Sequence, residues 1–361
     1  MTCFAIGEPQ YECSNWYKRI FGGLLNEKKQ KRFMLILLSC IEELNEFFVT
    51  ENDVLFVIGS DAAWLDEITD TAKTFFQNRI IVMGNHTPGL GGKTYSVVTG
   101  DISKDMNTLY THLKSCGSTK ICLYGVNPNS TSDKFKEEAF FALEPCKDNV
   151  FYNRGSLVRC FEDFSKRQSE FDGCICVNDF AAISLISHLE NKESIFIASY
   201  GGNSLVTMHK PAITHVKSNL DCFAGAGLEL AKLLCKNKNI NSVIIYISST
   251  FVTGETTGNV SDKQFEKVSL KNDAENSGDK LFYSDEEVKR LIKIETLLSS
   301  LCDPDFIIVE LMLEGNTYEE IASRVNMSVN GIKYKLKNMF EICQVKTRQE
   351  FCTLLRQLRI F

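Results

Sequence analysis

The first two thirds of the chain alternate short apolar runs with amphipathic segments of helical periodicity, and this alternation limits the fold more than any other feature. The first series predicts strands and helices in turn, with a Gly-rich turn at Gly89–Gly92. Its predicted strands are Cys3–Gly7, Met34–Leu38, Val54–Ile58, Ile80–Met83, Tyr95–Val98 and Ile121–Val126, and its predicted helices are Trp16–Lys31, Ile41–Phe48, Leu65–Phe76 and Met106–Ser115.

A second series follows directly. It predicts helices over Lys134–Leu143, Leu157–Arg167, Ala181–Leu189 and Leu228–Leu234, with strands at Val150–Tyr152, Cys174–Val177, Ile195–Ala198 and Val243–Ile247. Such alternation is typical of parallel sheets covered by helices on both faces. Two series in tandem predict an α/β protein with two doubly wound sheets. Ligands of open α/β sheets bind at the carboxyl ends of strands, so a small-molecule cleft between the two halves is expected.

Four motifs, in order, give this part of the chain a resemblance to a known family. They are Gly117–Gly125 followed by Ser132–Phe140, then Phe171–Ala182, Pro211–Val216 and Ser248–Thr250. Together they resemble the effector domain of LacI-type repressors, which shares its fold with periplasmic sugar-binding proteins. The resemblance implies a sensor domain over about residues 1–258, with two subdomains and crossovers near Asn127, Thr214 and Ser248. It also implies a small-molecule effector, of which a sugar is one class, and hinge closure as the signal.

Two residues depart from the family pattern. Lys136 stands where the family carries an arginine, and glycine follows Tyr200 where family members often carry an acidic residue that holds a sugar hydroxyl. The candidate cleft residues are Asn178 and Lys136, then Trp16, Asp61, Tyr152 and Tyr200, which lie at predicted strand ends or early in helices. For Asn178 a helix-capping role is an equal alternative, and for Trp16, which is amphipathic, a place in the core is the favoured alternative.

The chain then changes character. Thr253–Asp279 is rich in small polar and charged residues and predicts a loop or flexible linker. Val288–Leu301 has helical periodicity and predicts a connecting helix, so residues 259–300 are assigned as linker and connecting helix. Asp303, as N-cap before Pro304, predicts the start of a further helix that stops at Gly315.

Residues 301–361 predict a compact all-α domain. Thr317–Glu320 is a capping box, and Ser328 caps a basic helix that runs to about Ile342. Two helices joined by a short turn, the second of them basic, have helix-turn-helix organisation. The motifs Leu311–Ala322, Met327–Lys333 and Val345–Glu350 resemble the LuxR/NarL-type DNA-binding domain, a four-helix unit.

Double-stranded DNA is therefore the expected macromolecular partner. The candidate DNA-binding residues are Thr317, Ser328, Asn330, Lys333, Tyr334 and Lys337. Lys333, Tyr334 and Lys337 lie close together on one helix face, where lysines can reach guanine or phosphate and a tyrosine ring can meet a thymine methyl group. Thr317 and Asn330 lie near helix amino termini, which attract phosphate. A homodimer is expected, because paired half-sites add their binding energies.

Charge and composition agree with this organisation. The chain has a net charge of −6, yet residues 328–348 carry five Lys and Arg against one Glu, so positive charge is concentrated on the basic helix. The apolar runs are too short to span a membrane, and the start lacks the features of a signal peptide, so a cytoplasmic protein is expected. The 14 cysteines contain no Cys-x-x-Cys pair and are expected to be reduced thiols.

Catalysis is not indicated. The sequence shows neither a phosphate-cradling loop nor a set of nucleophile, base and orienting residue, and Phe223–Gly227 fits helix packing better than a dinucleotide loop. We therefore expect no cofactor, no metal and no enzyme. The alternative to a regulator is a sensor or scaffold whose helical tail mediates protein association.

Overall fold

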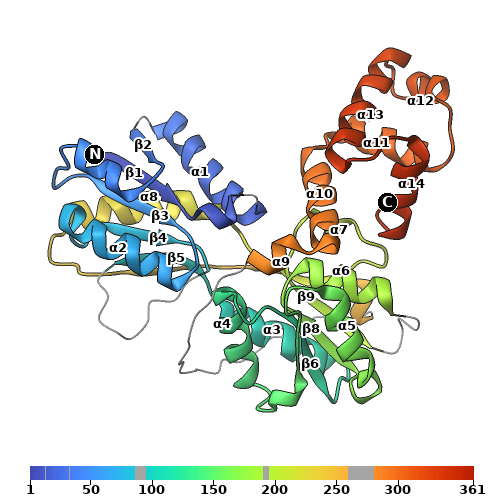
Figure 1. Cartoon of the computed structure of the whole chain (residues 1–361), viewed down its shortest axis with the longest axis horizontal. Helices are drawn as coiled ribbons and strands as arrows, with labels where there is room; N and C mark the ends of the chain where they lie inside the picture. The colour runs from blue at the N-terminus through green and yellow to red at the C-terminus, as the bar shows by residue number, and fades with distance from the viewer. Residues whose placement is uncertain (13, 32, 86–94, 190–194, 259–279) are drawn as a thin grey trace.

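A computed structural model describes residues 1–361 apart from 13, 32, 86–94, 190–194 and 259–279 (Figure 1). The turn expected at Gly89–Gly92 and most of the polar stretch at 253–279 lie outside the described residues.

Two six-stranded sheets form the body of the protein. The first, in the order β11-β5-β4-β3-β1-β2, is built from β1 (Thr2–Gly7), β2 (Met34–Leu38), β3 (Val54–Ile58), β4 (Ile80–Met83), β5 (Ser96–Gly100) and β11 (Ile244–Ile247). The second, in the order β12-β10-β9-β8-β6-β7, is built from β6 (Ile121–Val126), β7 (Val150–Tyr152), β8 (Gly173–Cys176), β9 (Phe196–Gly201), β10 (Thr214–Lys217) and β12 (Thr250–Val252). The β10–β12 ladder is antiparallel and the ladders of β1, β3, β6 and β8 are parallel, so the predicted α/β architecture of two doubly wound sheets is confirmed.

Helices cover both faces of each sheet. Subdomain 1, around the first sheet, contains α1 (Asn15–Lys31), α2 (Ala62–Phe76) and α8 (Cys222–Lys236). Subdomain 2, around the second, contains α3 (Ile102–Ser115), α4 (Thr131–Phe141), α5 (Leu157–Ser165), α6 (Asp179–His188) and α7 (Ser204–Met208). Short 3₁₀ helices lie at Pro9–Tyr11, Ile41–Glu46, Lys147–Asn149, Gln168–Glu170 and Glu255–Thr257.

The continuous apolar runs follow from this layering. Successive side chains of a strand point to opposite faces. In β3, Val54, Phe56 and Ile58 accordingly pack in the core under α1 and α8, whereas Leu55 and Val57 pack in the core under α2. A strand covered on both faces is apolar at every position, so it shows no alternation.

The chain passes between the subdomains at three places. The first crossing lies at Gly100–Asp101 instead of near Asn127, because α3 packs on the second sheet, against β8, β9 and β10. The second lies between the end of β10 at Lys217 and the start of α8 at Cys222, a few residues beyond Thr214. The third joins β11 to β12 through Ser248 and Ser249.

The C-terminal part, here called the tail, is all helical. It consists of α9 (Lys280–Ser284), α10 (Glu286–Ser300), α11 (Asp303–Leu313), α12 (Tyr318–Arg324), α13 (Val329–Cys343) and α14 (Arg348–Gln357). Thr317 and Ser328 cap α12 and α13 as expected. The prediction for α11 is wrong by one residue: its N-cap is Cys302, whose backbone N–H donates to Asp305 at 3.1 Å.

The tail and subdomain 2 share one hydrophobic core. Leu185, Ile186 and Leu205 of subdomain 2 belong to the same buried cluster as Leu291 and Leu298 of α10, and that cluster continues through α11 to α14. In Figure 1 the tail, coloured orange to red, stands on the green subdomain 2. The chain end adds a backbone bond, in which the N–H of Lys210 donates to Arg359 O at 3.0 Å.

Three further observations concern the described residues as a whole. None of their helices is long and apolar enough to cross a membrane. They contain no cluster of three potential metal-ligating side chains. Each of their cysteines is a free thiol, and Cys174 and Cys176 lie buried with their Sγ atoms 3.9 Å apart.

Candidate functional site

A cavity of about 360 Å³ lies between the two subdomains, at the carboxyl ends of their strands. This is the place and the size of a small-molecule site in an α/β protein. Subdomain 1 lines it from α1 and from the loops after β3 and β4, and subdomain 2 lines it from α4, the turn after β8 and the end of β9. The helices α9 and α10 line it from a third side.

Four of the predicted cleft residues line this cavity: Trp16, Lys136, Asn178 and Tyr200. Trp16 is half-buried on α1 and lies 5.3 Å from the ring of Tyr11. Its indole lies beside Gly84, and Gly84 in turn lies against Gly59. Gly84 has φ +154°, and a Cβ there would lie 2.4 Å from the carbonyl oxygen of Gly59. Glycine at position 84 therefore lets the loops after β3 and β4 approach each other closely.

Asn178 carries both roles that the sequence left open. Its Oδ1 accepts a hydrogen bond from the backbone N–H of Ala181 at 2.9 Å, which caps α6, and the residue also lines the cavity. The neighbouring Asp179 is buried, and desolvation raises its pKa. Its carboxylate accepts from Ser199 Oγ at 2.6 Å and from the N–H of Asn203 at 2.8 Å, so the structure already satisfies this anion.

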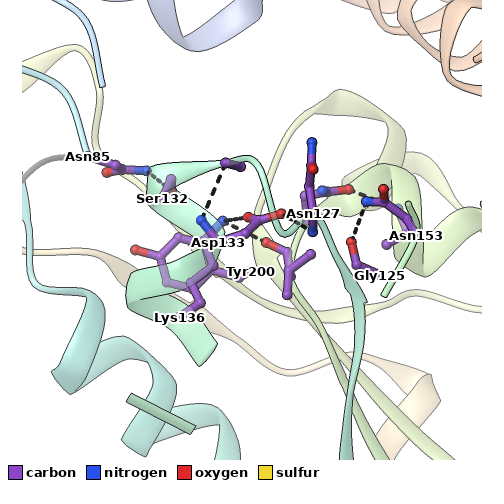
Figure 2. A network of polar contacts seen from close by, with 12 residues as sticks. Asn85, Gly125, Asn127, Ser132, Asp133, Lys136, Asn153 and Tyr200 are labelled. Carbon is purple, nitrogen blue, oxygen red and sulfur yellow. Dashed lines mark hydrogen bonds and ion pairs between the residues drawn. The ribbon is translucent and has the colours of Figure 1, made fainter. Parts of the chain in front are cut away.

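Lys136 is buried, and Figure 2 shows its contacts with neighbouring polar groups. Its Nζ donates to Asp133 Oδ1 at 2.8 Å and to the carbonyl oxygen of Val177 at 2.9 Å, and it lies 4.8 Å from the centre of the Tyr200 ring. A buried charge needs such partners because desolvation disfavours it. Lys136 thus presents the cavity with a neutralised pair.

Tyr200 connects the cavity to the third crossing. Its hydroxyl donates to Asp105 Oδ2 at 3.2 Å, and the same oxygen accepts from Ser249 Oγ at 2.6 Å. Desolvation raises the pKa of Asp105 to about 6, against the lowering effect of these two hydrogen bonds. A buried carboxyl therefore joins α3, β9 and the crossing segment at one point.

Two predicted cleft residues lie elsewhere. Asp61 does follow a strand, but its carboxylate accepts from the N–H of Trp64 at 2.9 Å and caps α2. Tyr152 lies on β7, the edge strand of the second sheet, and its hydroxyl donates to Glu137 of α4. Neither belongs to the residues that line the cavity.

The sequence reasoning missed several cavity residues. Asn85 Nδ2 donates to Ser132 Oγ at 3.3 Å, which joins the two subdomains across the cleft (Figure 2). Glu295 of α10 and Asn15 of α1 are also missed, because only the tertiary structure brings them together. Asp133 had a readable signal, since it lies three residues before Lys136 on one helix.

Most charged side chains around the cavity have partners within the protein. Arg19 forms two hydrogen bonds with Asp221, at 3.0 and 2.7 Å. Among the charged residues that line the cavity in the described part of the chain, the exposed Lys18 is the one for which no ion pair or side-chain hydrogen bond is found. The remaining surface combines amides and hydroxyls with aromatic rings.

The second candidate site is the exposed face of α13. Lys333, Tyr334 and Lys337 are exposed, Tyr334 to 67%, while Ile332, Leu336, Met339 and Cys343 are buried on the opposite face. Lys335 points inward instead, and its Nζ donates to Asp305 at 2.7 Å. Asn330 is exposed in the first turn, whereas Thr317 and Ser328 use their hydroxyls as caps.

No protein-family profile and no curated protein matches this chain. Solved structures do match. The transcriptional regulator CelR in complex with cellobiose has 14% identity and a TM-score of 0.57, covering 70% of this chain and 84% of that chain. The Lac repressor bound to ONPG has 10% identity and a TM-score of 0.56, covering 71% of this chain and 82% of that chain.

A LacI family regulator from Enterococcus faecium with bound ribose has 16% identity and a TM-score of 0.53, covering 72% of this chain and 100% of that chain. The fold of the two-subdomain body is the LacI-type fold. At these identities the likeness establishes the fold alone. The comparisons assign the tail helices to no family.

Proposed function

We propose that this protein is a ligand-responsive, DNA-binding transcriptional regulator without catalytic activity. The observation that carries the proposal is the presence, in one chain, of a LacI-type two-subdomain cleft and a helical tail with an exposed basic helix face. The cleft supports binding of a small molecule, and the basic face supports binding of double-stranded DNA. Such a regulator would act in the cytoplasm.

The ligand is an uncharged molecule with one apolar face. Lys136 and Arg19 are held in ion pairs and Asp179 accepts hydrogen bonds from Ser199 and Asn203, which leaves little free charge to hold an ionic ligand. The rings of Trp16 and Tyr11 offer a flat apolar surface, beside the amides and hydroxyls of the cavity wall. Sugars fit this description, and cellobiose and ribose are the ligands named for two of the similar structures.

The tail is the proposed DNA reader, with the LuxR/NarL-type arrangement that its sequence resembles. Helices α12 and α13 pack together and are joined by a short turn, and α13 presents Lys333, Tyr334 and Lys337 to solvent. We assign these three residues to the major groove, and Asn330, with the amino termini capped by Thr317 and Ser328, to phosphate contacts. Two copies of the chain would place two such helices on paired half-sites.

Selection from a random double-stranded DNA pool at fixed salt tests the reader function. The wild-type protein should enrich a sequence, and Lys333→Ala with Lys337→Ala should weaken its binding about 10- to 100-fold and flatten its salt dependence. The control variant carries Lys232→Ala and Lys238→Ala, at two lysines of subdomain 1 that lie on α8 and just after it. It should bind DNA as the wild type does. No enrichment by the wild type overturns the regulator and favours a scaffold.

A thermal-shift screen tests the sensor function. The panel contains ribose, cellobiose, nucleosides and neutral amino-acid derivatives, each with a phosphorylated or carboxylated counterpart. A ligand that binds only the folded state raises Tm. A neutral hit should lose affinity in Asn178→Ala and keep it in Asp61→Ala. Binding restricted to phosphorylated or carboxylated compounds overturns the assignment of an uncharged ligand.

A further inference from the structure

The cavity has a third wall, which comes from the tail. Tyr283 of α9 and Ile292, Thr296 and Ser299 of α10 line the same space as Trp16. The Tyr283 ring lies 6.2 Å from the ring of Tyr11, which in turn lies 5.3 Å from Trp16. A row of three aromatic rings therefore runs from subdomain 1 to the tail.

One buried carboxylate fixes this wall to both subdomains. Glu295 of α10 is 4% exposed. Its Oε1 accepts from Asn15 Nδ2 of subdomain 1 at 3.1 Å and from the N–H of Ser204 of subdomain 2 at 3.2 Å. Oε1 also accepts from Ser299 Oγ at 2.9 Å, and Oε2 accepts from the N–H of Leu205 at 2.9 Å.

The placement of Glu295 is costly, which makes it informative. Desolvation raises its pKa, and the hydrogen bonds offset part of that cost. A hydrophobic residue would attach α10 to the shared core without this desolvation penalty. A carboxylate with donors on both subdomains instead specifies the position of α10 relative to each of them, which apolar packing does not do.

We infer that α9 and α10 form part of the effector site itself, with Tyr283 and Thr296 in contact with the bound molecule and Glu295 as the positioning residue. The effector is then read by the tail directly, in addition to any hinge closure. This inference rests on the proposed sensor function. It adds specificity-determining residues from a segment that lies outside the two-subdomain body.

Acrylamide quenching of Trp16 fluorescence tests the wall without a known effector. The chain has two tryptophans, so Trp64→Phe leaves Trp16 as the single reporter. Acrylamide is a small neutral amide, and Trp16 lines the cavity, so we expect quenching to report access to that space. In Glu295→Ala and in Tyr283→Ala the quenching constant should rise toward that of free tryptophan, because the third wall is displaced or opened.

Two matched controls make the same substitutions, Glu to Ala and Tyr to Ala, at residues that do not line the cavity. Glu286→Ala removes an exposed carboxylate from the same helix, and Tyr246→Ala removes an exposed ring from subdomain 1. Both control variants should have the same quenching constant as the Trp64→Phe protein. Hydrogen exchange of the Ser204 and Leu205 amides should accelerate in Glu295→Ala alone. Asn15→Ala, which removes only the bond to subdomain 1, should also raise quenching and guards against loss of folding in Glu295→Ala.

Unchanged quenching in Glu295→Ala, Asn15→Ala and Tyr283→Ala overturns the inference. That outcome leaves DNA selection and the thermal-shift screen unaffected, so it is distinct from failure of the proposed function. Conversely, if the protein selects no DNA but the variants show the predicted rise in quenching, the third wall is supported and the proposed DNA-binding function fails. A neutral compound that raises Tm should also bind more weakly to Thr296→Ala than to Thr253→Ala, an equivalent change outside the cavity.

Discussion

The tail meets the two subdomains in different ways. Against subdomain 2 it shares a continuous apolar core, in which Leu291, Ile294 and Leu298 of α10 are buried together with Leu205 and Val206. Against subdomain 1 the contacts of α9 and α10 include a hydrogen bond from Asn15 to Glu295 and the half-buried ring of Tyr283, which packs against Tyr11 at the margin of that subdomain's core.

From this difference we predict which boundary moves when the cleft closes. Interiors are close-packed and resist small displacements, so subdomain 2 and the tail are expected to move as one body. Polar and edge contacts can be exchanged at lower cost. Closure of the cleft should therefore change the contacts of subdomain 1 with α9 and α10, while the tail stays seated on subdomain 2.

The largest expected effect comes from Lys136→Met. It leaves the Asp133 carboxylate buried without its cation, at a cost of about 3–5 kcal/mol. Because the tail packs on subdomain 2, the urea midpoints of the tail and of subdomain 2 should fall together when unfolding is monitored by hydrogen exchange. Lys166→Met is the control, since Asp163 and Lys166 have the same spacing but are exposed. Equal midpoints for both variants contradict the role given to the buried pair.

Leu291→Ala addresses the shared core directly. This buried side chain should cost about 2–5 kcal/mol when truncated, because the change removes apolar contact and leaves a cavity. Leu233→Ala, at a side chain that is 39% exposed, should cost much less. In Leu291→Ala, the protection of α6 and of α14 against hydrogen exchange should fall together. Loss of protection in α14 alone shows that the tail is an independent unit.

Asp105 gives the crossing a pH dependence. Its folded-state pKa of about 6 lies above the ordinary value of 3.8, so between these values the folded state holds a proton that the unfolded state has released. The contribution to stability is full below about pH 4 and falls, by at most about 3 kcal/mol, as pH rises to about 6. Asp105→Asn should remove this fall in the free energy of unfolding. The exposed Asp148→Asn should retain it, and an unaltered pH profile in Asp105→Asn rules out the assignment.

The sequence predicts the layers well because periodicity is a local property. A strand such as Val54–Ile58 is apolar throughout because it is covered on both faces, and its identity needs no tertiary information. The first crossing was misplaced for the opposite reason. The apolar face of α3 is compatible with either sheet, and only packing decides that it covers β8 and β9.

The candidate site divides in the same way. Asn178 and Tyr200 could be found because strand ends converge in this fold. Asp61 also follows a strand, but the free N–H groups of the adjacent helix hold its carboxylate. Glu295 could not be found in this way. Apart from Ser299, one turn along the same helix, its donors are 280 and about 90 residues away in the chain, so its burial and these partners arise only from the docking of the tail.

The smallest expected effect tests the other side of the boundary. Asn85→Ala removes the hydrogen bond to Ser132 that joins the subdomains across the cleft, and should change the free energy of unfolding by about 1 kcal/mol or less. The radius of gyration measured by small-angle scattering should nevertheless rise, because one contact that limits opening is lost while the core shared with the tail is intact. Asn45→Ala, which removes an intrahelical bond on the surface of subdomain 1, should leave the scattering curve unchanged. If both variants scatter alike, this bond does not limit the opening of subdomain 1, and the contacts of α9 and α10 hold the cleft by themselves.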